Sequence, residues 1–274
     1  MLERKIFFTD LDATLLTDDK MILDGSRRAL EEMLRREYPV VFCTGRVLHS
    51  AAVQVRRIGF YLPGCYLICY NGGQVFEIAG EKILYSNSLS ADLVAACFRT
   101  AAEEDVHIQA YAGFDAGTVL ARRPSPHLDS YCAVQKLEQM IVEDVTAHIG
   151  ASTPKMLAIE TDREKMDRFR EKVHARVGDR VDLFMSSNTY LELVPPGINK
   201  GNAVRFLCEH LGIPVENSVA AGDAENDISM LQAAGVGAAV ANAQDAVKAS
   251  ADYVSDLDNN HDAVAQILEK FVLV

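Results

Sequence analysis

The sequence predicts an α/β protein in which a parallel-sheet domain is interrupted by an inserted α+β domain. Toward both ends of the chain, short apolar runs alternate with segments whose apolar residues recur at helical spacing, which is typical of a parallel sheet with crossover helices. Between about Leu84 and Pro195 the runs are longer and alternate apolar with polar residues. Such alternation favours a sheet with one face covered by helices and one face open.

In the first part of the chain the pattern predicts strand, helix, strand, helix, strand. These elements are expected at residues 5–10, 26–37, 39–46, 49–60 and 65–73. Each predicted strand is followed by polar residues, in TDLD, CTGR and YNGG. Because ligands of open parallel sheets bind outside the carboxyl ends of the strands, these three endings are expected to share one functional edge.

The last part repeats the pattern. Helices are expected at 199–212, 227–235, 245–251 and 262–271, and strands at 218–223, 235–240 and 251–256. In the insertion, strands are expected at 106–113, 155–161, 181–187 and 189–195, with helices at 91–105 and 162–177. The expected domains are therefore 1–84 with 195–274, and 85–194.

Composition excludes several classes of function. Net charge is −12 over 274 residues, and there is no basic run, so nucleic acid and anionic membranes are not expected partners. The first residues contain no secretory or membrane-spanning pattern. Six scattered cysteines without a CxxC pair indicate reduced thiols in a cytoplasmic protein. No obligate protein partner is evident.

The acidic residues that follow the strands predict a metal site. Asp10 and Asp12 lie two positions apart at a strand end, and within a strand such residues share a face. Two close carboxylates repel each other unless a cation relieves them, and Mg²⁺ prefers hard oxygen ligands. A second acidic cluster, which includes Asp223 and Asp227, follows another predicted strand and supplies the remaining ligands.

Two further positions predict phosphate binding. Thr44, followed by Gly45, offers a hydroxyl and backbone N–H groups to an anion. Lys200 places a positive charge near a helix N-terminus, where the helix dipole already favours anions.

Taken together, these motifs resemble the haloacid dehalogenase superfamily. The matching stretches, in chain order, are D-x-D-x-T-L at 10–15, T-G-R at 44–46, P-G-x-x-K-G at 196–201 and G-D-x-x-N-D at 222–227. Their order and the large insertion between the second and third are similar to the Cof-type branch, which consists of sugar-phosphate phosphatases with a C2-type cap. The resemblance implies a Rossmann-like core with an α+β cap, and it spans nearly the whole chain.

The resemblance also implies roles. Asp10 would be the nucleophile that forms an aspartyl-phosphate, and Asp12 the general acid and base. Thr44 and Lys200 would hold the phosphoryl group. Mg²⁺ would be bound by Asp10, the backbone carbonyl of Asp12 and Asp223. Asp227 would support the metal shell, and Asn226 would lie near the phosphate or the metal's waters.

Four further positions lie in or beside these motifs. Asn71 and Gly72 match a further Cof-type feature near the substrate. Arg46 either contacts the substrate or forms a structural ion pair. Ala13 stands where the family usually has glycine, and we expect geometry and activity to survive because alanine is the smallest substitute.

The predicted function is Mg²⁺-dependent hydrolysis of small phosphorylated metabolites, with sugar phosphates favoured. A phosphomutase on the same scaffold and a phospho-accepting signalling module are the alternatives, and a phosphate-binding protein without activity is a further one. In the insertion, Arg122 and Arg123 either contact an anionic substrate or lie in a solvated loop.

Overall fold

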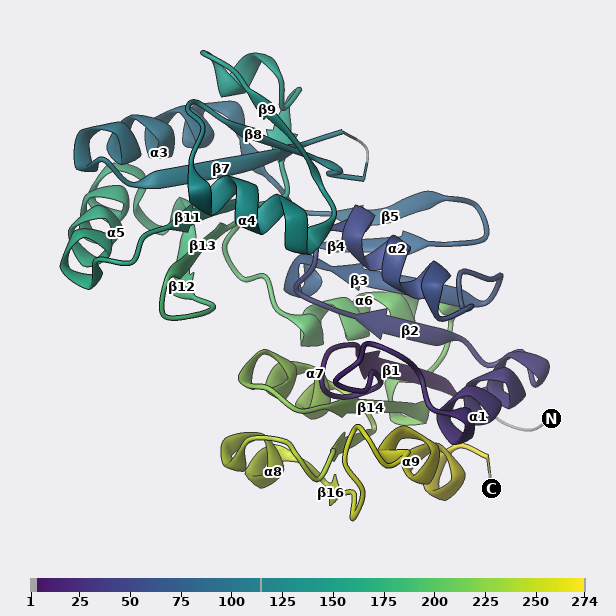
Figure 1. Cartoon of the computed structure of the whole chain (residues 1–274). Helices are drawn as coiled ribbons and strands as arrows, with labels where there is room; N and C mark the ends of the chain where they lie inside the picture. The colour runs from purple at the N-terminus through teal and green to yellow at the C-terminus, as the bar shows by residue number, and fades with distance from the viewer. Residues whose placement is uncertain (1–3, 114, 274) are drawn as a thin grey trace. The chain divides into compact units, whose positions relative to one another are not determined.

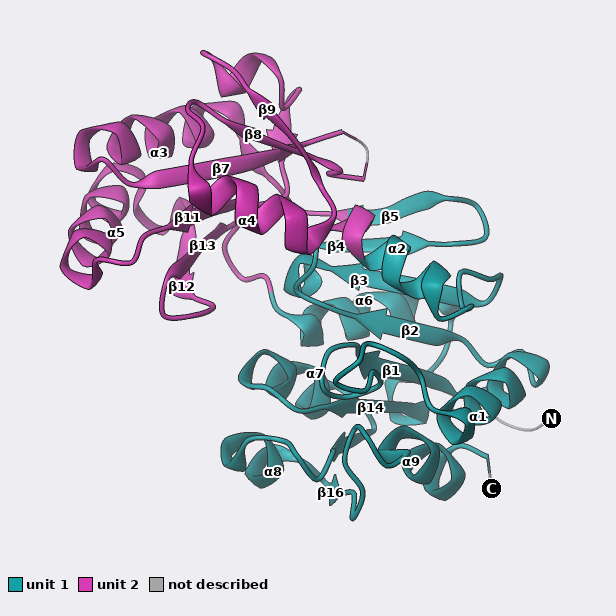
Figure 2. Cartoon of the chain, viewed as in Figure 1, with its two compact units in different colours: residues 1–46, 51–85, 199–274 teal, residues 47–50, 86–198 magenta. Residues whose placement is uncertain are grey.

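The computed structural model describes residues 4–113 and 115–273. The chain forms two compact units (Figures 1 and 2). The core unit contains residues 1–46, 51–85 and 199–274, and the inserted unit contains residues 47–50 and 86–198. The division into two domains predicted from the sequence stays a prediction: one domain of residues 1–84 and 195–274, and another of residues 85–194.

The core unit is built on an eight-stranded sheet with the order β16-β15-β14-β1-β2-β3-β4-β5. The strands are β1 (Ile6–Asp10), β2 (Val40–Cys43), β3 (Cys65–Cys69), β4 (Gln74–Glu77), β5 (Lys82–Ser86), β14 (Ser218–Gly222), β15 (Val236–Ala239) and β16 (Tyr253–Val254). From β16 to β3 all neighbours are parallel, whereas β4 runs antiparallel to β3. The predicted parallel sheet is thus confirmed.

Among the described residues, six α-helices complete the core unit. They are α1 (Asp24–Arg35), α2 (Leu48–Arg57), α6 (Lys200–Leu211), α7 (Ile228–Ala233), α8 (Asp245–Ser250) and α9 (Ala263–Phe271). Helices α1 and α2 connect strands in one direction along the sheet, and α7 connects strands in the other. Because parallel crossovers are right-handed, α7 lies on the opposite face from α1 and α2. Both faces are therefore covered, and β1 is buried along its length.

The register of the central strands brings their carboxyl ends to one edge. Asp10 pairs with Cys43, and Cys43 in turn pairs with Ile68. On the other side of β1, Thr9 pairs with Ala221, one residue before the end of β14. The polar segments that follow β1, β2, β3 and β14 therefore begin at nearly the same level, as the sequence predicted.

The inserted unit contains a six-stranded mixed sheet with the order β12-β13-β11-β7-β8-β9 and a separate β10-β6 pair. Its strands are β6 (Leu89–Ser90), β7 (His107–Ala112), β8 (Thr118–Ala121), β9 (Glu138–Ile141), β10 (Ser152–Thr153), β11 (Met156–Ile159), β12 (Asp182–Met185) and β13 (Tyr190–Val194). Its helices are α3 (Ala91–Glu104), α4 (Pro126–Gln135) and α5 (Arg163–Val177).

One face of this sheet packs on α3 and α5 over an apolar core that includes Phe98, Phe169 and Leu193. The other face was expected to be open, and this expectation was wrong in part. Tyr111 on that face donates its hydroxyl to Tyr131 of α4 at 2.8 Å. Helix α4 thus covers part of it, because α4 turns its buried apolar side chains toward the sheet.

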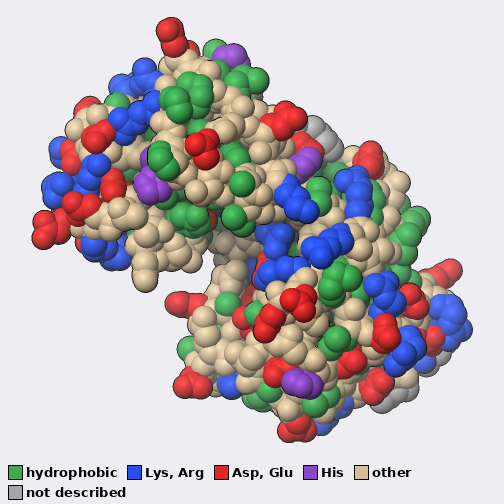
Figure 3. Space-filling model, viewed as in Figure 1, with side chains coloured by type: hydrophobic (Ala, Val, Ile, Leu, Met, Phe, Trp, Pro, Cys, Tyr) green, Lys and Arg blue, Asp and Glu red, His purple; other side chains and the backbone are tan. Residues whose placement is uncertain are grey.

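Two further features of the described residues concern the cysteines and the apolar character of the helices. All six cysteines lie in the described residues, where they are buried and form no disulfide. Within the described part of the chain, no helix combines the length and the apolar character needed to cross a membrane. Acidic and basic side chains are both spread over the face drawn in Figure 3.

Candidate active site

The centre of the site is a buried lysine between two aspartates. Lys200, the first residue of α6, is fully buried. Its Nζ donates to Asp10 Oδ1 at 2.5 Å and to Asp227 Oδ1 at 2.6 Å. Burial opposes the charged form of Lys200, but the two carboxylates outweigh it and raise the pKa of the ammonium. Lys200 is therefore a fixed cation at the end of β1.

Asp223 adds a third carboxylate to this centre. Asp10, Asp223 and Asp227 each offer an oxygen atom that lies within 4.8 Å of those of the other two. Burial raises the pKa of Asp10 well above its usual value, with Lys200 opposing and Asp227 adding to the rise. Burial likewise raises the pKa of Asp223. Three carboxylates, two of them buried and that of Asp223 half-buried, thus face one ammonium, so that in their charged forms they leave an excess of negative charge.

The donor set fits a divalent cation. All three groups are hard carboxylate oxygens, the type that Mg²⁺ and similar ions select. Two of the three groups are held by further hydrogen bonds: Asp223 Oδ1 accepts from the Thr14 hydroxyl at 2.7 Å, and Asp227 Oδ2 accepts from two backbone N–H groups at 3.0 and 3.1 Å. Such outer hydrogen bonds orient metal ligands. The three carboxylates thus suggest a divalent metal site, while the metal-binding role expected for Asp12 stays a prediction.

The two-residue alternation of a strand does not set the orientation of the Asp12 side chain. Strand β1 ends at Asp10, so the carboxylate of Asp12 does not continue its alternation. It accepts two hydrogen bonds from the Arg46 guanidinium, at 2.7 and 2.8 Å, and one from Lys20 Nζ at 2.9 Å. Burial opposes the charged form of Asp12, but Arg46 and Lys20 outweigh it and lower the pKa. Arg46 thus forms an ion pair with a candidate catalytic residue.

Thr44 is buried directly after β2. Its backbone N–H donates to Ile68 at 2.8 Å and its hydroxyl oxygen accepts from the Arg46 N–H at 3.1 Å. The N–H of Thr44 is thus used within the sheet, so its hydroxyl hydrogen is what it can offer to an anion. At Gly45, a Cβ atom would lie 3.0 Å from the side-chain oxygen of Asn71. The absence of a side chain at Gly45 therefore lets the two loops approach each other closely.

The loop after β3 links the other segments of the site. Asn71 has φ of 56° and donates its N–H to the Thr44 carbonyl at 3.0 Å. Its side-chain oxygen accepts from Asn226 Nδ2 at 3.0 Å. Gly72 has φ of 105°, and a Cβ there would lie 2.2 Å from the carbonyl oxygen of Asn199. Only glycine fits where this loop meets the start of α6.

Ala13 occupies a left-handed conformation with φ of 61°. Glycine adopts this conformation freely, whereas an alanine there is strained. The carbonyl of Ala13 accepts from Asn242 Nδ2 at 2.8 Å, and Asn242 Oδ1 accepts from the Asn259 N–H at 3.0 Å. Asn259 in turn donates to the Leu16 carbonyl at 3.0 Å. The C-terminal part of the chain thus holds the loop in its strained form.

The sequence did not predict that Lys20 and Asn242 contribute to the site, and no role was predicted for Thr14. Thr14 lies in the D-x-D-x-T-L motif, so its position was a signal that could have been used. Lys20 and Asn242 lie outside all four motifs, and their distances in sequence from Asp12 and Ala13 follow no regular spacing. Only the folded chain brings them to the loop.

Comparison with known proteins identifies the family. A model of the haloacid dehalogenase-like hydrolases matches residues 7–268. The chain belongs to this family. Its predicted Cof-type fold, a parallel-sheet core with an inserted cap, is confirmed, and so is the expected enzyme class, a hydrolase of the phosphatase type.

The relatives extend over the whole chain. The chain is 30% identical over 276 residues to the 5-amino-6-(5-phospho-D-ribitylamino)uracil phosphatase YcsE of Bacillus subtilis, covering 98% of this chain and 96% of that protein. It is also 30% identical over 275 residues to the chloroplastic endoribonuclease YBEY of Arabidopsis thaliana, but it spans only 46% of that protein. A crystal structure of a haloacid dehalogenase-like hydrolase from Bacteroides thetaiotaomicron has a TM-score of 0.89 at 28% identity, covering 98% of this chain and 99% of that one.

Proposed function

We propose that the protein is a Mg²⁺-dependent phosphatase that hydrolyses small phosphorylated metabolites, with sugar phosphates as the favoured class. The observation that carries this proposal is the buried group of Asp10, Asp223 and Asp227 around Lys200. Its excess of negative charge calls for a divalent cation, and Lys200 supplies a fixed positive charge beside the carboxylate of Asp10. A carboxylate beside two cations is suited to react with a phosphate ester that would otherwise be repelled.

In the proposed reaction, an oxygen of Asp10 attacks the phosphorus atom and the bond from phosphorus to the ester oxygen breaks. Because Arg46 and Lys20 favour the charged form of Asp12, Asp12 must first bind a proton, which it then gives to the departing alkoxide, so that the group leaves as an alcohol. Asp12 then takes a proton from water, which attacks the aspartyl-phosphate and releases inorganic phosphate and free Asp10. The hydrogen bonds from Arg46 and Lys20 hold the Asp12 carboxylate in one orientation between these two steps.

The remaining site residues are proposed to bind and orient. Lys200, the hydroxyl of Thr44 and the backbone at Gly45 hold the phosphoryl oxygens, and Asn226 is placed beside them through Asn71. The metal would be held by Asp10, the backbone carbonyl of Asp12, Asp223 and Asp227. When bound, Mg²⁺ supplies charge stabilisation to the transferring phosphoryl group. Gly72 and Arg46 lie at the same edge and are proposed to border the substrate.

The substrate class is supported by the names of relatives. The Bacillus subtilis relative is named as the phosphatase of a phosphorylated ribityl compound. A phosphate ester of a sugar or sugar alcohol has the alcohol leaving group that general-acid catalysis by Asp12 assists. We therefore place sugar phosphates first and leave the individual ester to experiment.

The test is phosphate release from a panel of phosphorylated metabolites, with Mg²⁺ and with EDTA, beside Asp10→Asn as a matched blank. We expect Mg²⁺-dependent release from some esters and none from Asp10→Asn. Isomerisation of a sugar phosphate without net release of phosphate would establish the phosphomutase instead. Phosphorylation that needs a partner kinase, with no turnover of free esters, would establish the signalling module. Full activity of Asp10→Asn would refute the nucleophile.

A further inference from the structure

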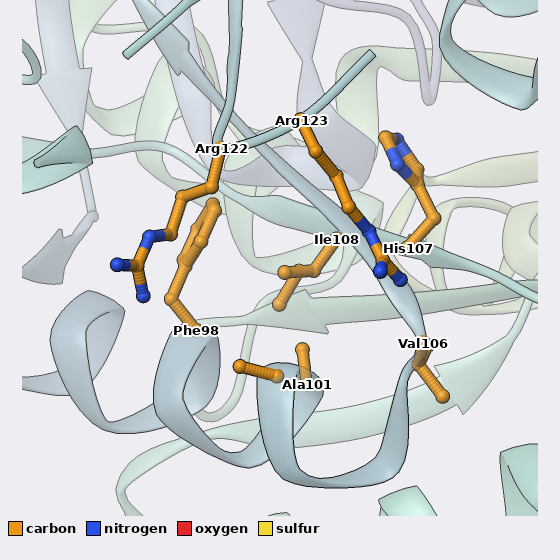
Figure 4. Close-up of a pocket in the computed structure, with 8 residues that line it drawn as sticks. Phe98, Ala101, Val106, His107, Ile108, Arg122 and Arg123 are labelled. Atoms are coloured by element: carbon orange, nitrogen blue, oxygen red, sulfur yellow. The ribbon is translucent and has the colours of Figure 1, made fainter. Parts of the chain in front are cut away.

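The inserted unit contains a hollow with an apolar floor and a basic rim. Its volume is about 250 Å³, and its lining residues come from α3, the start of β7 and the segment after β8: Phe98, Ala101, Ala102, Val106, His107, Ile108, Arg122 and Arg123. Figure 4 shows Arg122 and Arg123 on opposite sides of Ile108, with Phe98 beside Arg122. The hollow lies wholly within one unit.

The floor consists of side chains that also belong to the apolar core. Phe98, Ala101 and Ile108 are 4%, 1% and 6% exposed, so they are nearly sealed by their neighbours. What remains open between them and the two arginines is a small space with an apolar base. Known ligand sites of ~300–1,000 Å³ pair apolar walls with a few placed polar groups. This hollow has the same composition at a somewhat smaller size.

The positive charge at the rim comes from the arginines and not from His107. Both ring nitrogens of His107 are already engaged, Nε2 with Gln109 at 3.2 Å and Nδ1 with Ser125 at 3.1 Å. Burial also lowers the pKa of His107, which favours its neutral form. His107 therefore shapes the wall without adding charge.

The two arginines differ in their partners. Arg123 forms an ion pair with Asp105 at 2.6 Å, which also lies near Lys165 at 3.4 Å. Arg122 makes no hydrogen bond or ion pair with any side chain among residues 4–113 and 115–273. The pKa of the nearby Asp144 is lowered chiefly by hydrogen bonds from Thr146, with only a small contribution from the charge of Arg122. Arg122 also lines a neighbouring hollow with Glu143 and Asp144, and the donors of its guanidinium remain available beside Phe98.

We propose that this hollow binds a small organic anion, with a flat apolar group on Phe98 and Ile108 and a carboxylate or phosphate on Arg122. A guanidinium matches such anions through two parallel hydrogen bonds. The volume allows about a single ring with a short acidic arm. All residues that line the hollow belong to the inserted unit, whereas Asp10, Asp223 and Asp227 belong to the core unit.

The test uses the full-length protein and phenylacetate as the probe, with binding followed by calorimetry and by methyl NMR signals of Ile108. We expect a dissociation constant on the order of 1 mM, given the few atoms of the probe. 2-Phenylethanol, which lacks the charge, and acetate, which lacks the ring, are expected to bind at least about tenfold more weakly. If acetate bound as tightly as phenylacetate, the interaction would be surface ion pairing alone and the proposal would be refuted.

Variants locate the binding. Arg122→Gln is expected to weaken phenylacetate binding at least about tenfold, whereas Arg163→Gln, at an exposed arginine of α5, leaves it unchanged. Ala102→Phe fills the hollow from an exposed position three residues from the end of α3 and abolishes binding. Ala175→Phe places the same side chain at the matching exposed position of α5 and serves as its control.

Several outcomes would overturn the proposal. Absence of binding in the wild type, or binding that survives both Arg122→Gln and Ala102→Phe in folded protein, would do so. Circular dichroism verifies the fold of each variant. Because Asp10→Asn is expected to leave phenylacetate binding intact, failure here and failure of the proposed phosphatase activity are separate results.

Discussion

Both units of this protein bury charged side chains, but they do so in different proportions. In the inserted unit, Lys155 donates to Glu192 at 2.9 Å, and the second oxygen of Glu192 accepts from the Ser186 hydroxyl at 3.0 Å. That pair has one charge of each sign. In the core unit, Lys200 faces Asp10 and Asp227, with Asp223 close by.

The difference teaches that an imbalance of buried charge marks a reactive site better than buried charge itself. A balanced buried pair is satisfied within the protein, and it adds little stability over apolar side chains of similar size. An unbalanced group is satisfied only when something else arrives, either a cation or a substrate. Perturbed carboxylates gather at functional sites for the same reason.

The largest contrast is expected from the same carboxylate-to-amide change in the two units. Asp10→Asn removes the proposed nucleophile, so turnover of a simple phosphate ester should fall by at least about 10⁴-fold. Glu192→Gln removes the negative charge of the Lys155–Glu192 pair and should leave turnover of that ester within about threefold of wild type once folding is verified. Initial rates of phosphate release with saturating Mg²⁺ measure both. Equal losses of turnover in the two variants would contradict the distinction between balanced and unbalanced buried charge.

A second contrast concerns stability in the inserted unit. Lys155→Met leaves the Glu192 carboxylate buried without its ammonium and should lower the free energy of unfolding by about 3 to 5 kcal/mol. The double change Lys155→Met with Glu192→Leu removes both charges and should recover most of that loss. Urea denaturation followed by circular dichroism gives the two values. A double variant as unstable as the single one would mean that the pair does more than balance charge.

Metal binding should separate the units in a third way. An ion that binds only the folded protein, at 100 times its dissociation constant, raises the free energy of unfolding by about 2.7 kcal/mol. Mg²⁺ should therefore slow hydrogen exchange in β1 and β14 of the core unit and leave β7 and β11 of the inserted unit unaffected. Asp223→Asn should reduce this protection, and EDTA should reverse it. Uniform protection across both units would contradict a local site.

The smallest effect is expected at two alanines with left-handed backbone, one in each unit. Ala13 and Ala116 have φ of 61° and 55°. Replacing either with glycine relieves a conformational cost of about 1 kcal/mol, so both variants should be more stable by up to that amount in urea denaturation. Ala116→Gly is the control for turnover. Ala13→Gly should keep turnover within about threefold, and a larger change would show that strain in this loop affects the reaction.

The position of the site could be predicted because strand ends of a parallel sheet share one edge. Asp10 and Asp223 are brought together by that rule although they come from opposite parts of the chain, whereas Lys200 reaches them from the first turn of α6. The orientation of Asp12 could not be predicted in this way, because the two-residue alternation holds only inside a strand and β1 ends at Asp10. Its partners Arg46 and Lys20 depend on how two loops fold back.

The elements that were missed are those whose sequence lacks a strong period. Strands β4 and β5 were not expected, and they extend the core sheet beyond β3. Strands β8 and β9 of the inserted sheet were not expected either, because their sequences, TVLA and EQMI, do not alternate apolar with polar residues. Helix α4 begins at Pro126, directly after Ser125, and Pro124 precedes that serine. A serine between two prolines is typical of a turn. In the structure, the Ser125 hydroxyl caps the helix by accepting from the Leu128 N–H at 3.1 Å.

The place of β1 in the sheet has a consequence for how the protein is made. Strand β1 lies between β2 and β14, and β14 begins only at Ser218. While a ribosome synthesises the intervening residues, one edge of β1 keeps unpaired N–H and C=O groups, and Phe7 and Phe8 have no cover on that side. Exposed edges of this kind recruit other chains. We therefore expect the nascent chain to be prone to association with other chains until β14, which lies in the last quarter of the sequence, has been made.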